Sequence, residues 1–235
     1  MGKMNYYDIA DSHFKKYCEQ IQFKTHEEWL KLRMEGIGGS DVSAILGHNK
    51  YRNAPDVYDS KFKLEESEPS YAIEYGNYFE SILFDTFKWK YSSEYETLNY
   101  KNVMFRNYFI PFSQASVDGV LVDKLTNQVG LLEIKTAQGK KSSWYYDNGD
   151  RGIPREYLDQ ATHYFITTGV DFIVFYAQID YKDRDDIDRD SEILKPRRIN
   201  REDMLDYMAL VQQEEFNFWN NYIMKKERPP KRVVY

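Results

Sequence analysis

Two short segments set the architecture of this chain: Ser116-Val117-Asp118-Gly119-Val120 and, after residues 121–130, Leu131-Leu132-Glu133-Ile134-Lys135. Side chains alternate between the two faces of a strand, so Glu133 and Lys135 project from one side while Ile134 faces the core. If the two segments form a hairpin, Asp118 approaches Glu133. The pattern therefore predicts two carboxylates and one ammonium group in a single pocket.

Such a pocket suits a metal ion. Two close carboxylates repel each other unless they share a proton or a cation, and hard oxygen ligands favour Mg²⁺ or Mn²⁺. The Ile134 carbonyl offers one more oxygen. A metal held there lowers the pKa of a bound water, which Lys135 can hold or help to deprotonate. This is chemistry for cutting a phosphodiester.

The competing interpretation is an ordinary hairpin, because Asp-Gly is a common turn pair and Glu and Lys suit the wet face of a strand. The apolar neighbours of Glu133 argue against it. Leu131, Leu132 and Ile134 predict a strand covered on both faces, and buried charges are rare without partners or a metal.

The chain around this hairpin alternates helical and strand patterns. We expect an antiparallel sheet with turns within residues 91–136, with its hairpin connection at 124–128, and a further strand over 171–181. Residues 182–190 are rich in charge and predict a solvated loop. The order of helices, strands, helix, strand and helix predicts an α/β fold with a mixed sheet flanked by helices.

Capping signals place the helices. Thr25 begins one that stops at Gly36, and a glycine-rich entrance at 38–41 begins a short one that stops at Gly47. Others are expected over 55–62, 73–88 and from 154 to just before 169. Asn200 with Asp203 predicts the cap of a long final helix over about 201–227. Its aromatic residues favour core packing over a subunit contact.

The composition excludes several classes of protein. At 42% hydrophobic and 30% charged residues, without a run of 18 apolar residues, the 235-residue chain predicts one globular domain over 1–235 and no membrane span. The net charge of −6 argues against coating of nucleic acid by bulk positive charge. The segment from Met1 to Gln20 lacks the pattern of a secretory signal, and Cys18 is the only cysteine, so we expect a cytoplasmic protein. The four histidines show no metal-ligand spacing.

A second candidate element is an anion pocket formed by Arg33 with Gly38, Gly39 and Ser40. Backbone amides at a helix entrance favour an anion, glycine permits its close approach, and the Ser40 hydroxyl can donate. Without a ligand, Ser40 would be a helix cap and Arg33 a solvated arginine. Basic residues that would extend the surface are Lys50 and Arg52 and, beside the aromatic Trp144, Lys140 and Lys141. The alternative for Trp144 is a partly buried anchor in a solvated loop.

The motifs also carry a family resemblance. Asp118 with Glu133-Ile134-Lys135 resembles the signature of the PD-(D/E)XK nuclease superfamily, with Val117 in place of a proline that shapes the strand but supplies no ligand. The same signature occurs here in order with the segments 29–33, 36–41, 75–80 and 157–160. Together these motifs make the region from about 25 to 181 similar to the YqaJ-type viral recombinase family. That family is in turn similar to the lambda exonuclease. The resemblance implies a restriction-endonuclease-like core.

It also implies roles for individual residues. Asp118 and Glu133 match metal-binding carboxylates, the Ile134 carbonyl a further ligand and Lys135 the catalytic lysine. Glu80 matches an acidic residue on a helix facing the metal, with Gly76 leaving room beside it, so the resemblance makes Glu80 a further catalytic and metal-binding residue. Gln160 matches a glutamine that lies just beyond the active site. The resemblance also implies that Arg33, Gly39 and Ser40 form a pocket for the 5′ phosphate of DNA.

The sequence thus predicts a Mg²⁺-dependent deoxyribonuclease, with Mn²⁺ as the other candidate metal, acting as a 5′→3′ exonuclease on double-stranded DNA ends. The alternatives are a structure-specific or repair endonuclease on the same core and a non-catalytic DNA-binding recombination module. The presence of Glu80, Asp118, Glu133 and Lys135 together argues against the second. The resemblance further implies phage-type recombination in a bacterial host cytoplasm, a single-strand annealing protein as partner and a homo-oligomeric ring.

Overall fold

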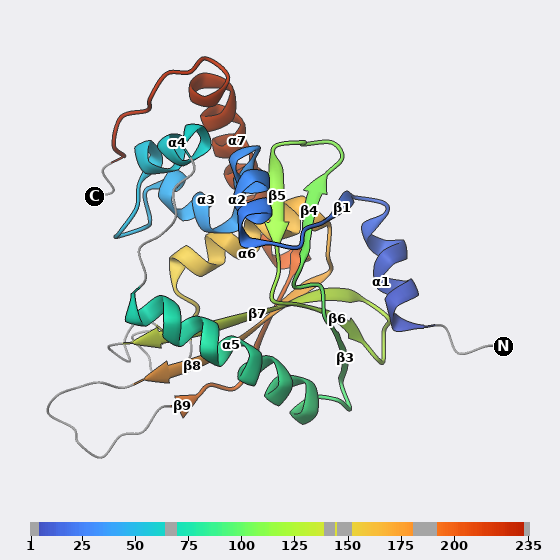
Figure 1. The fold of residues 1–235 in the computed structure, drawn as a ribbon. Coiled ribbons are helices and arrows are strands. Elements are labelled where there is room, and N and C mark those ends of the chain that lie inside the picture. Colours follow the sequence, from blue (N-terminus) through green and yellow to red (C-terminus); the bar gives the residue numbers. More distant parts are fainter. Residues whose placement is uncertain (1–4, 64–69, 139–143, 145–151, 181–191, 233–235) are drawn as a thin grey trace, which may run out of the picture.

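Two sheets form the centre of the molecule, with helices on their outer faces (Figure 1). The computed structural model describes residues 5–63, 70–138, 144, 152–180 and 192–232. The larger sheet has the order β10 (Arg197–Asn200), β8 (Phe172–Asp180), β7 (Val129–Gln138), β6 (Gly119–Asp123) and β3 (Tyr95–Leu98), with β9 (Glu192–Ile193) paired to β8. The smaller sheet has the order β1 (Cys18–Gln22), β4 (Val103–Asn107), β5 (Ser113–Ser116) and β2 (Ile37–Gly38).

The predicted hairpin is confirmed. Strands β6 and β7 pair antiparallel with Gly119 opposite Leu132. The Asp123 carboxylate accepts hydrogen bonds of 3.0 Å from the backbone of Leu125 and Thr126 in the connecting turn. On its other edge β7 pairs parallel with β8, so β7 lies between two neighbours in a mixed sheet. This register brings the residue before Gly119 alongside the residue after Leu132.

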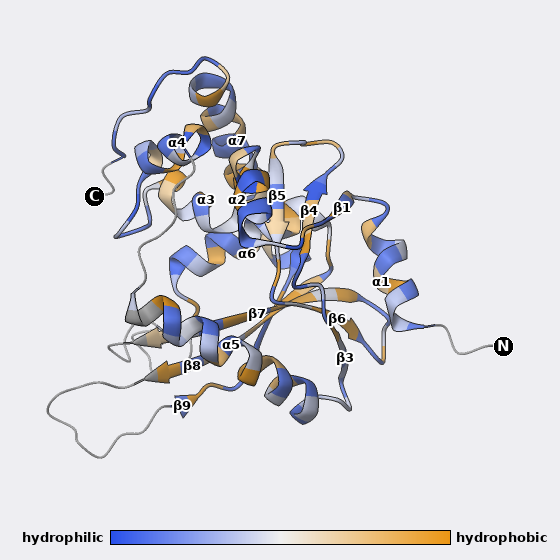
Figure 2. Ribbon diagram, viewed as in Figure 1, coloured by the Kyte–Doolittle hydropathy of each residue, from blue (hydrophilic) through white to orange (hydrophobic). Residues whose placement is uncertain are grey.

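Strand β7 is covered on both faces, as its apolar residues predict. Leu131 belongs to the main core, and Leu132 and Ile134 belong to a second core that includes Leu83 and Phe87 of helix α5 (Tyr71–Lys90). Figure 1 shows α5 along one face of the large sheet and α6 (Arg155–Thr168) beyond the other. In Figure 2 the central strands are largely hydrophobic, whereas the helices show mixed surfaces. Charged groups on β7 are therefore held inside the molecule.

Most predicted helices are present. Thr25 Oγ1 accepts a 3.1 Å hydrogen bond from the Glu28 backbone and caps α2 (His26–Met34). Helix α3 (Gly39–Leu46) ends at Gly47 and α6 ends at Gly169, with φ of 81° and 67° respectively, in the left-handed region that glycine adopts without steric cost. Helix α4 spans Ala54–Phe62, as expected.

Three features differ from the expectations. Helix α1 (Tyr6–Phe14) and strand β1 precede the first expected helix, and β4 and β5 join the smaller sheet instead of one continuous antiparallel sheet. The final helix is composite, with a 3₁₀ turn over Arg201–Met204, α7 over Leu205–Phe218 and a π turn over Trp219–Ile223. It ends before the expected residue 227 because the backbone turns left-handed at Lys226 (φ 56°).

The C-terminal aromatic residues contribute to the core. Phe218 is buried, and the Trp219 ring stacks on Phe112 with centroids 5.0 Å apart. The expected loop at 182–190 lies outside the described residues. Among the helices that are described, none combines the length and apolar character needed to cross a bilayer.

Candidate active site

Asp118 lies between β5 and β6 and points at β7. Its Oδ2 atom accepts a 2.7 Å hydrogen bond from the backbone N–H of Ile134. The bond fixes the Asp118 carboxylate beside Glu133, the residue before Ile134. The hairpin therefore brings the two predicted carboxylates together.

Glu133 is the centre of the site and is 2% exposed. Its Oε1 atom accepts hydrogen bonds from Lys135 Nζ and, at 2.8 Å, from Gln160 Nε2. Its Oε2 atom is buried and has no hydrogen-bond partner among the described residues. Lys135 Nζ also lies 5.1 Å from the centre of the Tyr157 ring, which holds the ammonium group over an aromatic face. One carboxylate oxygen is thus satisfied and the other is free for a ligand.

The electrostatics of the site favour an added cation. Burial raises the pKa of both Asp118 and Glu133 above its ordinary value, and the charge of Glu133 raises the Asp118 pKa further. Burial alone lowers the pKa of Lys135, but Glu133 and Asp118 outweigh it and raise that pKa, so the side chain is an ammonium group at neutral pH. Lys135 therefore enters the site as a hydrogen-bond donor and a positive charge.

A divalent metal fits part of this donor set. Glu133 Oε2, which has no hydrogen-bond partner among the described residues, and the carboxylate of Asp118 are hard oxygen donors. They lie in a buried cleft where the nearby positive charge does not balance their negative charges. Among the described residues, no three His, Cys, Asp or Glu side chains gather to hold an ion. Glu80 lines the same cleft, but its Oε1 atom accepts a 3.1 Å bond from Lys101. Two carboxylates are therefore in place, and the other ligands would come from backbone, water or substrate.

Gln160 lies where the sequence predicts it and connects two parts of the site. Besides its bond to Glu133, Nε2 donates a 2.9 Å bond to the hydroxyl of Tyr164, which in turn donates a 2.7 Å bond to the Ser116 carbonyl. Tyr164 is buried and is a site residue that sequence reasoning missed. Its signal was the four-residue spacing from Gln160, which places both side chains on one face of α6.

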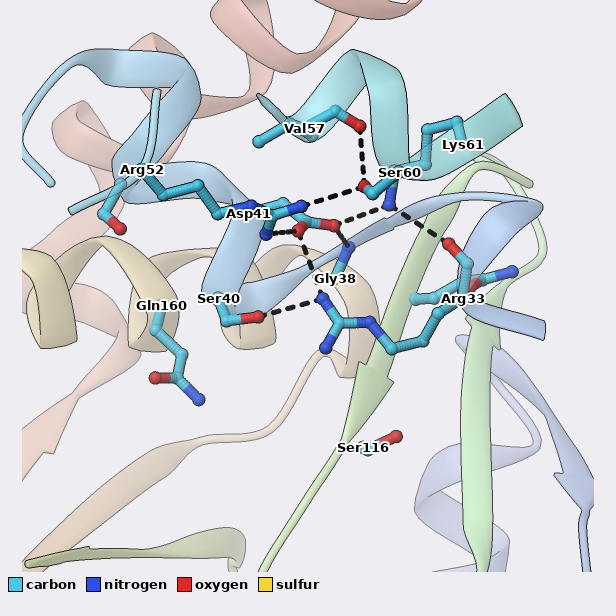
Figure 3. Close-up of polar contacts among 12 residues, drawn as sticks. Arg33, Gly38, Ser40, Asp41, Arg52, Val57, Ser60, Lys61, Ser116 and Gln160 are labelled. Carbon is cyan, nitrogen blue, oxygen red and sulfur yellow. Dashed lines mark hydrogen bonds and ion pairs between the residues drawn. The ribbon is translucent and has the colours of Figure 1, made fainter. Parts of the chain in front are cut away.

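The predicted anion pocket opens into the same cleft. Arg33, Gly38, Gly39 and Ser40 line this hollow of about 290 Å³ together with the carboxylates, Lys135 and Gln160. Arg33 Nη2 donates a 2.9 Å bond to Ser40 Oγ (Figure 3). A Cβ atom at Gly39 would lie 2.6 Å from Cε1 of Tyr164, so glycine at this position lets the start of α3 pack against α6. The close approach at Gly39 is therefore made by a helix of the protein.

The other predicted basic residues are placed differently. Lys50 is exposed, whereas Arg52 turns inward and donates to Asp41 at 2.5 Å and to Ser60 at 2.8 Å. Lys140 and Lys141 lie outside the described residues. Trp144 is 3% exposed and packs against the ring of Tyr157, with centroids 5.4 Å apart. Trp144 is thus the buried anchor, and its indole is not free to stack on a base in this structure.

The fold defines the class, a restriction-endonuclease-like α/β domain, and its cleft brings together Asp118, Glu133 and Lys135, the residues that the sequence matches to the PD-(D/E)XK signature. The chain belongs to the family of the YqaJ-like viral recombinase domain, whose model matches residues 28–171. The resemblance that the motifs carry, and the α/β restriction-endonuclease-like fold that it implies, are confirmed.

Relatives extend this similarity over most of the chain. YqaJ of Bacillus subtilis (strain 168) is 26% identical over 213 residues, which cover 87% of this chain and 59% of that protein. An alkaline exonuclease of Laribacter hongkongensis, LHK-Exo, matches in fold with a TM-score of 0.59 and 20% identity, over 85% of this chain and 97% of that one. A structure of LHK-Exo with dAMP gives a TM-score of 0.60 at 20% identity, over 85% and 93% of the two chains.

Proposed function

We propose that this protein is a Mg²⁺-dependent deoxyribonuclease that degrades double-stranded DNA from its 5′ ends in phage-type recombination. The observation that carries the proposal is one cleft that contains Asp118, Glu133 with its orphaned oxygen, and Lys135, next to the pocket of Arg33 and Ser40. Membership of a recombinase family and a fold shared with an alkaline exonuclease support it.

Each residue of the site has a role in this proposal. Asp118, Glu133 and the Ile134 carbonyl would hold the Mg²⁺ or Mn²⁺ ion, which supplies a Lewis acid for the phosphate and an acidified water. Lys135 donates a hydrogen bond to the attacking water, and Gln160 holds Glu133 in its orientation. Glu80, paired with Lys101, contributes negative charge at the rim, since it raises the pKa of both Asp118 and Glu133.

The anion pocket supports the choice of an exonuclease. A terminal 5′ phosphate held by Arg33, Ser40 and the amides at the start of α3 would leave the following phosphodiester in the same cleft as Glu133. Cleavage would then proceed from the 5′ end. Lys50, Lys140 and Lys141 are proposed to contact the phosphates of the duplex farther from its end, whereas Arg52 is bonded to Asp41 and Ser60 inside the protein.

One gel assay tests the proposal. End-labelled linear, nicked and closed circular duplexes are incubated with the protein and Mg²⁺, with EDTA as the control. We expect loss of linear DNA from the 5′ ends, no cutting of closed circles and no cutting in EDTA. Cutting of closed circles would favour the endonuclease alternative. Metal binding by calorimetry without hydrolysis of any duplex would favour the non-catalytic module.

Assembly and partners have their own measurement. We propose a ring of several copies, which would keep the enzyme on the strand that it encloses, and a single-strand annealing protein that receives the exposed strand. Light scattering of the purified protein measures the number of copies. A monomer that degrades long duplexes without dissociating would contradict the ring.

A further inference from the structure

Asp41 is a fully buried carboxylate that accepts four hydrogen bonds, three of them from cations. Oδ1 accepts from Arg33 at 3.1 Å and from Arg52 at 2.5 Å, and Oδ2 accepts from Lys61 at 2.7 Å and from the Gly38 backbone at 3.0 Å (Figure 3). Gly38 is the residue before α3, so Asp41 ties the entrance of that helix to the surrounding cations. The sequence segment 36–41 includes this residue, but the sequence predicted no role for it.

Asp41 and its partners hold Arg33 both at its guanidinium group and at its backbone. Its guanidinium is held by Asp41 and Ser40, and its backbone carbonyl accepts a 3.1 Å bond from Lys61, whose ammonium group also binds Asp41. The guanidinium carbon lies 5.0 Å from the centre of the Trp29 ring, and the Trp29 indole donates a 3.0 Å bond to Ser116 Oγ. The orientation of Arg33 is therefore set before any ligand arrives.

The contacts leave part of the guanidinium for a ligand. Both bonds that Arg33 donates use Nη2, and Nε and Nη1 have no partner among the residues that the structure describes. The Arg33 side chain is 24% exposed and lines the cleft. Nη1 carries two N–H groups and points away from Asp41, so it is the atom that can donate to the oxygens of a phosphate in the cleft.

The net charge of Asp41 and the three cations around it also favours the binding of an anion near Arg33. Three cations, Arg33, Arg52 and Lys61, surround one carboxylate, which leaves an excess of positive charge beneath the entrance of α3. Burial alone raises the pKa of Asp41, but the charges of Lys61, Arg33 and Arg52 hold that pKa well below its ordinary value. The carboxylate stays ionised and keeps the three cations together, and the excess charge is available to a phosphate.

We propose that Asp41 is a positioning residue for the recognition of the terminal phosphate: it holds Arg33 through Nη2 so that Nη1 is left for a ligand in the cleft, without touching DNA itself. The inference rests on the proposed function, in which Arg33 and Ser40 bind the 5′ phosphate. It adds that the selectivity for a phosphorylated end depends on a carboxylate buried behind the arginine.

The test compares Asp41→Asn with the wild type and with Arg33→Ala. Binding of two blunt duplexes of one sequence, one with a 5′ phosphate and one with a 5′ hydroxyl, is measured by fluorescence anisotropy in EDTA. The values of kcat and KM on both duplexes are measured with Mg²⁺. We expect Asp41→Asn to weaken binding of the phosphorylated duplex about tenfold, the size of one lost charge-assisted bond, and the hydroxyl duplex less than twofold. KM should rise more than kcat falls.

Two further variants make the result specific. Asp59→Asn makes the same change on α4, at an exposed ion pair between Asp59 and Arg228, and this variant should bind both duplexes like the wild type. If Asp41→Asn does not fold, the double variant Asp41→Asn with Lys61→Met removes the carboxylate and one buried cation together, and it should show the same selective loss.

The outcomes separate the inference from the proposed function. Wild-type binding of the phosphorylated duplex by Asp41→Asn or by the double variant would overturn the positioning role, and so would equal losses on both duplexes. A wild type that cuts DNA but binds both duplexes equally would overturn the phosphate pocket together with this role and leave the nuclease intact. A wild type that cuts no DNA would overturn the proposed function, while the anisotropy measurement would still decide the role of Asp41.

Discussion

The Asp118 carboxylate accepts its hydrogen bond from the backbone of Ile134, the residue between Glu133 and Lys135. Since neighbouring side chains of a strand point to opposite faces, a bond to this N–H leaves the Glu133 and Lys135 side chains together on the cleft side and Ile134 in the core. One backbone contact thus orients three functional groups. Because the donor is a backbone group, we expect Asp118 to keep its place when a substitution changes Glu133 or Lys135.

Substitution of Glu133 or Lys135 should therefore remove cleavage and leave binding. We expect Glu133→Gln and Lys135→Ala to lower kcat for linear duplex by about a thousandfold or more, because the metal ligand or the hydrogen-bond donor to the attacking water is lost. Affinity for DNA in EDTA should change less than threefold. Lys31→Ala, at an exposed pair with Glu27, is the control and should be fully active. Full activity of either site variant would refute the assigned roles.

Asp118→Asn should abolish metal binding without unfolding the protein. The amide oxygen can still accept the bond from Ile134, but the site loses one of its two negative ligands. In the wild type, Mg²⁺ at a hundred times its Kd should stabilise the fold by about 2.7 kcal/mol, and the variant should show almost no shift in Tm. Without metal the variant should melt at or above the wild-type Tm, because a buried repulsion is removed. An unchanged Mg²⁺ shift would show that the ion binds elsewhere.

The hairpin and its carboxylates were predictable because they depend on local rules. Alternation along a strand, a short polar turn and the apolar neighbours of Glu133 determine which side chains share a pocket. The helix ends at Gly47 and Gly169 follow from the left-handed backbone that glycine adopts. These features need no knowledge of distant contacts.

The unpredicted features depend on contacts that are remote in the sequence. Strand β1 has only one fully buried side chain, Cys18, and forms by pairing with β4 far along the chain. The site role of Tyr164 depends on the Ser116 carbonyl, 48 residues away, and the role of Asp41 on Arg52 and Lys61. A single sequence contains the residues of such networks but not their partners.

Arg33→Ala should impair the use of phosphorylated ends selectively. The variant removes the guanidinium atoms that face the cleft and leaves Asp118, Glu133 and Lys135 in place. We expect kcat/KM for a 5′-phosphorylated duplex to fall about tenfold to a hundredfold, and that for a 5′-hydroxyl duplex to fall much less. Equal losses on the two ends would remove the phosphate pocket and leave the nuclease assignment standing.

The last prediction concerns stability and His163, one of the four histidines whose spacing showed no metal-ligand pattern. His163 of α6 is completely buried against β5 and α7, where Nδ1 lies 2.7 Å from Glu215 Oε1 and Nε2 lies 2.8 Å from the Gln114 carbonyl. Both ring nitrogens thus face acceptors, which the imidazolium form satisfies. Burial lowers the pKa of His163, but the charge and hydrogen bond of Glu215 outweigh it and raise that pKa above 6.5.

A group whose pKa is raised by folding stabilises the protein fully below its unfolded pKa, here about 6.5, and this stability is lost as the pH rises through the folded value. Glu215→Gln should therefore lower the free energy of unfolding by about 3 kcal/mol at pH 6, and by clearly less at pH 9, as measured by urea denaturation. The neighbouring Glu214→Gln, at a partly exposed pair with Arg232, should cost less than about 1 kcal/mol at either pH. A loss for Glu215→Gln that is equal at both pH values would contradict a charged His163, because a neutral imidazole has no charge to lose in this range.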